Sequence, residues 1–160
     1  DCHMRNLKAT PAIAALLASL AMPGAALAQE REWMLDAADE DAFLVFGVPE
    51  TDDVGVSLWC KIGSGRVKIF FPDGSPDLKP DTIADFTMTV AGKPHALKGT
   101  TTANAMTGAT SVESEFPLDD AVITELGSAD RFSVKIGTHE STYPLVDAGL
   151  ENLIKLCRSK

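Results

Sequence analysis

The chain has 160 residues, of which 45% are hydrophobic and 23% are charged, and its formal net charge at pH 7 is −9. A net negative charge repels phosphate groups, so the composition argues against nucleic acid or an anionic membrane surface as the main partner. The length is sufficient for one domain with a hydrophobic core.

The first 28 residues have the organisation of a secretory signal peptide. Arg5 and Lys8 make a short basic start, an apolar run follows over residues 13–22, and small residues lead to Ala-Leu-Ala at 26–28. This order is typical of a segment removed after export. A membrane anchor is the alternative, but the run is shorter than the ~20 apolar residues that cross a bilayer.

Cleavage is expected after Ala28. We interpret residues 1–3, which precede Met4, as a cloning remnant or upstream translation. Residues 29–160 are then expected to form a single β-rich domain that is periplasmic or secreted and has no stable membrane insertion.

Alternation of apolar and polar side chains predicts eight or nine short strands after the signal segment. Their ranges are 33–36, 42–48, 55–62, 66–71, 85–90, 95–100, 111–116, 131–136 and 140–143. Small polar residues at 101–110 indicate a loop or a weak edge strand. A short crossover helix is expected over 119–126, and a C-terminal helix from about Asp147. The predicted fold class is mainly β: an antiparallel β-sandwich or a curled, barrel-like sheet.

Two cysteines remain after the signal segment, Cys60 and Cys157. Strand alternation places Cys60 on the apolar face of its strand, and helical spacing places Cys157 on the apolar stripe of the last helix. In an exported protein this pair predicts one structural disulfide. The alternatives are two separate buried thiols or a redox pair, although the C-x-x-C pattern of redox sites is missing.

Groups suited to catalysis are scarce. The histidines of the expected domain are His95 and His139, and the sequence contains no G-x-S-x-G motif. We therefore assign no catalytic residue. Acidic residues gather at 36–41, at 50–53 and at Asp73 with Asp77, where calcium binding stays an open question because none matches the EF-hand spacing. We assign no metal site and no cofactor.

One hairpin carries an apolar and cationic patch on the side away from the predicted core. Its members are Trp59, Lys61, Arg66, Lys68 and Phe70. Trp, Phe and Arg are favoured anchors of protein interfaces, so this patch is the candidate binding surface. The alternative is that a second sheet or a helix covers it.

Four segments suggest a resemblance to small exported sandwich proteins of Gram-negative bacteria. They are Trp33, residues 49–53 (PETDD), residues 89–93 (TVAGK) and residues 143–157 (from Tyr-Pro-Leu to Cys). The last two segments resemble the invasion-associated locus B family. The resemblance implies an envelope location, a periplasmic β-sandwich with a final short helix, and a non-enzymatic binding role.

The favoured hypothesis is a non-enzymatic exported binding or accessory domain of the cell envelope, with an envelope or extracellular protein as its partner. One alternative is an inhibitor of an envelope or host hydrolase that inserts the acidic loop 50–53 or the hairpin tip at Ser64 and Gly65. Two others are a small enzyme dependent on His95 or His139 and a module stabilised by calcium. The sequence does not predict the oligomeric state.

Overall fold

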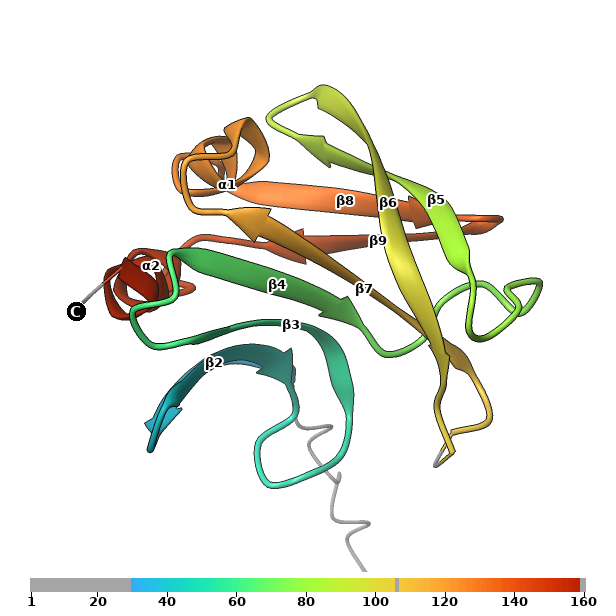
Figure 1. Ribbon diagram of the computed structural model, residues 1–160, viewed down its shortest axis with the longest axis horizontal. Coiled ribbons are helices and arrows are strands. Elements are labelled where there is room, and N and C mark those ends of the chain that lie inside the picture. Colours follow the sequence, from blue (N-terminus) through green and yellow to red (C-terminus); the bar gives the residue numbers. More distant parts are fainter. Residues whose placement is uncertain (1–29, 106, 159–160) are drawn as a thin grey trace, which may run out of the picture.

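The computed structural model describes residues 30–105 and 107–158, which fold as one curled antiparallel sheet with two helices (Figure 1). The expected signal segment, residues 1–28, lies outside the described residues. The strands are β1 (Glu32–Ala38), β2 (Asp41–Gly47), β3 (Val54–Lys61), β4 (Arg66–Phe71), β5 (Ile83–Val90), β6 (Lys93–Ala103), β7 (Thr110–Pro117), β8 (Arg131–Ile136) and β9 (His139–Pro144). The helices are α1 (Ala121–Leu126) and α2 (Leu150–Arg158).

The fold class is the predicted one, and of the two predicted architectures the structure has the curled sheet. The described strands form one nine-stranded sheet in the order β1-β2-β3-β4-β7-β6-β5-β8-β9, and every pairing is antiparallel. Two neighbouring pairs, β4 with β7 and β5 with β8, are not consecutive in the chain. A long loop, residues 72–82, leads from β4 to β5, and α1 lies between β7 and β8 in the chain. Neither helix of the described part of the chain is long and apolar enough to cross a membrane.

Strand β6 is longer than predicted, because it continues to Ala103 through the segment expected to be a loop or weak edge. Thr101 explains the difference, since its side chain is fully buried. Its hydroxyl donates to the carbonyl of Lys79 at 2.8 Å, and its backbone pairs with Val112 of β7. A small polar residue can therefore extend a strand where a neighbouring loop satisfies its hydroxyl.

Both helices begin later than predicted, and the local backbone gives the reason. Asp120 has extended backbone angles and its carboxylate accepts from the amide of Val122, so it caps α1 instead of joining it. Before α2, Asp147 and Gly149 have φ of 57° and 80°, in the left-handed region that ends regular structure.

Alternate residues of each strand face one core on the concave side of the sheet. Cross-strand neighbours such as Leu44, Leu58 and Ile69 are at most 1% exposed. Helix α1 adds Val122, Ile123 and Leu126, and α2 adds Leu150, Leu153 and Cys157. The two helices lie at the same end of the curled sheet (Figure 1). The concave side is thus filled, and the other side of the sheet is its outer face.

Side chains of β1 and β9, the two outermost strands, hold the curl. The indole Nε1 of Trp33 donates to the carbonyl of Pro144 at 2.6 Å. The hydroxyl of Tyr143 donates to the carbonyl of Gly55 at 3.0 Å, and its ring meets Phe46 edge-on at 6.0 Å. Burial raises the pKa of Tyr143, so this hydroxyl keeps the proton that it donates.

Helix α2 is fastened to the turn between β3 and β4 by three bonds. Cys60 and Cys157 form the predicted disulfide across 97 residues. The amides of Gly63 and Gly65 donate to the carbonyls of Leu156 and Cys157 at 3.1 and 2.9 Å. These carbonyls belong to the last turn of α2, where no intrahelical amide can reach them. Both glycines have φ above 70°, which is why glycine occupies these two positions.

Removing the disulfide should lower stability strongly. In the chain-entropy model, a bridge over a loop of this length contributes about 4–5 kcal/mol, equivalent to roughly 10–20 °C in melting temperature. Cys60→Ala, Cys157→Ala and the double variant should all melt lower by the same amount, as measured by circular dichroism. The wild type in reducing agent is the control, and it should melt with the variants. Identical melting with and without the bridge would contradict this prediction.

The Tyr143 hydroxyl should contribute to closing the curl. Tyr143→Phe keeps the ring but leaves the carbonyl of Gly55 without this donor, so the free energy of unfolding should fall by about 1 kcal/mol. Thr142→Ala, an exposed change on the same strand, is the control and should have little effect. Urea titration measures both, and equal unfolding free energies for wild type and Tyr143→Phe would refute the role of this bond.

Candidate binding surface

The five candidate residues lie together on the outer face of β3 and β4. Trp59 is directly opposite Lys68 in the register, and Ser57 is opposite Phe70. Their outward direction follows from strand alternation, because the residues between them, including Leu58 and Ile69, are buried in the core. Lys61 and Arg66 lie at the ends of the two strands, beside the turn.

No described element covers this face. The alternative of a second sheet does not apply to residues 30–105 and 107–158, because their nine strands belong to one sheet. The buried side chains of α1 and α2 belong to the core cluster on the concave side. Phe43 of β2, the cross-strand neighbour of Trp59, is 36% exposed. We use the name outer strip for Phe43 together with the five predicted residues.

Carboxylates balance each of the three cations of the outer strip. The Nζ of Lys68 is 3.1 Å from Oε1 of Glu113, and Arg66 is paired with Glu115. Lys61 lies 3.8 Å from Glu40. The strip is therefore close to neutral although the chain carries a net charge of −9.

Trp59 is held in one orientation by its neighbours. Its Nε1 donates to Oε2 of Glu113 at 3.1 Å. On the β2 side its ring is stacked with Phe43 at 6.0 Å, and on the β4 side the ammonium of Lys68 lies 4.5 Å from the ring centre. The indole thus makes one hydrogen bond, one stacking contact and one cation–π contact.

A depression of about 260 Å³ opens beside this row. It is lined by Trp59, Cys60, Lys61, Ser64, Arg66, Lys68 and Glu115. Its wall combines aromatic and aliphatic surface with paired charges, which suits a side chain of a partner protein. Phe70 lines a second depression with residues of β6 and β7, including Thr100 and Ser111.

Sequence reasoning missed Phe43, Glu113 and Glu115. The alternation in the predicted strand 111–116 does place both glutamates on one face. Their contact with the hairpin depends on the pairing of β4 with β7, which are separated by two other strands in the chain. No local pattern encodes that adjacency.

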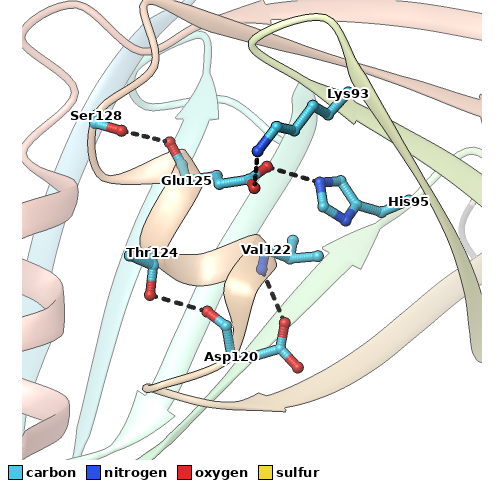
Figure 2. Close-up of polar contacts among 7 residues, drawn as sticks. All are labelled: Lys93, His95, Asp120, Val122, Thr124, Glu125 and Ser128. Carbon is cyan, nitrogen blue, oxygen red and sulfur yellow. Dashed lines mark hydrogen bonds and ion pairs between the residues drawn. The ribbon is translucent and has the colours of Figure 1, made fainter.

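The two histidines occupy different settings. Nε2 of His95 on β6 is 2.8 Å from Oε2 of Glu125, at the end of α1, and Lys93 reaches the other oxygen at 2.9 Å (Figure 2). These bonds fasten α1 to the first residues of β6. Nε2 of His139 on β9 lies 3.0 Å from the hydroxyl oxygen of Ser141 on the same strand, in an exposed position.

Helix α1 is further ordered by bonds within its own turn. The hydroxyl of Thr124 donates to the carbonyl of Asp120, and that of Ser128 donates to the carbonyl of Glu125 (Figure 2). The Lys93 ammonium and the His95 ring, in that order, lower the pKa of the Glu125 carboxyl below its ordinary value of 4.5.

The acidic segments of the sequence are dispersed in the structure. Asp53 is paired with Arg31, and Glu40 with Lys61. Within the described ranges, no three His, Cys, Asp or Glu side chains lie close enough together to hold a metal ion.

Comparisons of the chain with models of protein families, with curated proteins and with solved structures find no match.

The Glu125 contacts should make stability depend on pH. Because the folded-state pKa is lowered, ionised Glu125 stabilises the fold above about pH 4.5, and this contribution is lost as the pH falls through the folded-state value. The melting temperature of the wild type should therefore fall more between pH 6 and pH 3 than that of Glu125→Gln. Glu140→Gln, an exposed change on β9, should behave as wild type. Parallel pH profiles for wild type and Glu125→Gln would rule out this contribution.

Proposed function

We propose that this protein is an exported, non-enzymatic binding or accessory domain of the cell envelope, and that it binds an envelope or extracellular protein through the outer strip. The observation that carries the proposal is the aromatic row of Phe43 and Trp59, which lies on an outer face that no described element covers. The depression beside Trp59 supplies a concave contact next to this row.

The order of the strip supports a binding role. Binding orders side chains, and each rotamer-rich side chain that becomes fixed costs free energy. Trp59 and Lys68 already have fixed partners in the free protein, so less entropy is lost when they meet a second surface. Because the charges are paired, a partner can cover the strip without burying an unmatched ion.

The location rests on two features. The first 28 residues have the pattern of a secretory signal, and Cys60 forms a disulfide with Cys157. Structural disulfides persist in oxidising compartments such as the periplasm or the exterior. Both features support export.

The alternative functions have less support from specific contacts. The hairpin tip considered for an inhibitor is engaged with α2, because the amide of Gly65 donates to the carbonyl of Cys157. In the acidic loop, Asp53 is paired with Arg31. For a histidine-dependent enzyme, the His95 ring is bonded to a carboxylate that Lys93 also holds.

Site-specific cross-linking tests the proposal. The photoreactive residue p-benzoylphenylalanine, placed at Phe43 in the exporting cell, should give a covalent adduct with one recurrent protein, identified by mass spectrometry. The same residue at Glu140, exposed on β9, is the control and should not give that adduct. No adduct at Phe43, or the same adduct at both positions, would exclude the outer strip as the interface.

Affinity for the captured protein then provides the quantitative measurement. With both proteins purified, Phe43→Ala combined with Phe70→Ala should weaken binding by about 2–3 kcal/mol, or roughly a hundredfold. Val146→Ala removes an exposed aliphatic side chain elsewhere and should leave the affinity unchanged. Equal affinities for all three proteins would mean that the aromatic side chains of the strip do not contribute.

A further inference from the structure

The outermost strand β1 has an open edge. It pairs with β2 on one side and is the first strand of the nine-stranded sheet, so no described strand pairs with its other side. In an edge strand, every second residue directs its backbone N–H and C=O groups outward, where another strand can bond to them. Residues 35–38 are exposed, and β1 contains no proline, lysine or glycine of the kind that commonly protects an edge.

The two faces of β1 differ in chemistry. The register places Leu35 opposite the buried Leu44, and Ala37 opposite the buried Ala42, so these side chains lie on the concave side. Leu35 is nevertheless 40% exposed, because it lies at the margin of the core. On the outer face, Glu32 and Asp36 are both exposed.

We propose that the open edge of β1 binds an extended, basic segment of a partner protein by strand addition. Side chains of an added strand alternate between the two faces of the sheet. Its cations would meet Glu32 and Asp36 on the outer face, and its apolar side chains would cover Leu35 on the concave side. This edge adjoins the outer strip, because Asp36 is opposite Phe43 in the register. The inference depends on the unpaired backbone groups of β1 and therefore does not rest on the proposed function.

Charge argues against a second copy of the chain as the occupant. An antiparallel pairing of two β1 strands centred on Met34 places Glu32 directly opposite Asp36, and one centred on Asp36 places that residue opposite its own copy. A pairing centred on Leu35 places both acidic residues opposite uncharged ones, so it avoids the repulsion but gains no charge pair. Like charges directly opposite each other destabilise a strand pair. A basic strand converts the same positions into favourable pairs.

The experiment uses a capped, fluorescein-labelled peptide of alternating lysine and valine, matched in length to β1. Fluorescence anisotropy should show saturable binding to the protein. An alternating glutamate–valine peptide and a peptide with the same lysines and valines in two blocks should each bind at least about tenfold more weakly, because one reverses the charges and the other loses the alternation. Equal binding of the three peptides would overturn the proposal.

Charge reversal on β1 separates this edge from the general acidity of the chain. Glu32→Lys combined with Asp36→Lys should weaken binding of the lysine–valine peptide at least about tenfold. Asp119→Lys combined with Glu140→Lys makes the same change in net charge at exposed positions elsewhere, and it should retain most of the affinity. Equal losses in the two double variants would show that only net charge matters and would overturn the assignment to β1.

Amide hydrogen exchange identifies the surface that the peptide covers. Bound peptide should slow exchange at alternate residues of β1, since only these direct their N–H groups outward. Protection confined to the outer strip or to α2 would overturn strand addition at this edge. Sedimentation that shows two copies of the protein associating through β1 without peptide would assign the edge to a second copy instead.

Discussion

The attachment of α2 to the turn between β3 and β4 is the constraint on which the rest of the structure depends. A nine-residue helix is too short to be stable by itself in water, so it needs a partner surface. The disulfide of Cys60 and Cys157 ties the helix to β3, and the amides of Gly63 and Gly65 satisfy carbonyls of its last turn. With the helix fixed there, Leu150 and Leu153 cover one end of the concave core.

The same attachment determines what the outer face presents. Strand alternation means that if Cys60 is held toward the core, Trp59 must point outward. Lys68 and Glu115 follow across β4 and β7 in direct register, so a covalent bond on one side fixes a row of side chains on the other. The contacts of Trp59 with Phe43 and Glu113 then orient the indole within that row. The disulfide therefore fixes both which side chains of β3 enter the core and which of them belong to the outer strip.

Local sequence patterns predicted the strands and helices well, but they did not predict contacts that depend on which strands pair. Alternation located the strands, and the facing of Cys60 and Cys157 predicted their disulfide. The contacts of Glu113 and Glu115 with the hairpin were not predicted. They depend on the pairing of β7 with β4, and β5 and β6 lie between these two strands in the chain. The extension of β6 through Thr101 was also not predicted, because the buried hydroxyl is satisfied by the carbonyl of Lys79, 22 residues earlier in the chain. Local patterns do not predict the order of the strands in the sheet, and that order determines which charged side chains form ion pairs.

The edge of β1 is open because the curled sheet does not close by backbone pairing between its two outermost strands, β1 and β9. Full closure of a barrel would need backbone hydrogen bonds between β1 and β9. At the point of contact β9 ends in Pro144, which has no N–H to donate, and the contact is made by the indole of Trp33 to the proline carbonyl. One side-chain bond holds the margins together without pairing their backbones. The fold therefore fills its concave side and leaves the edge of β1 as a row of outward backbone groups, between the exposed Leu35 on one face and the acidic Asp36 on the other.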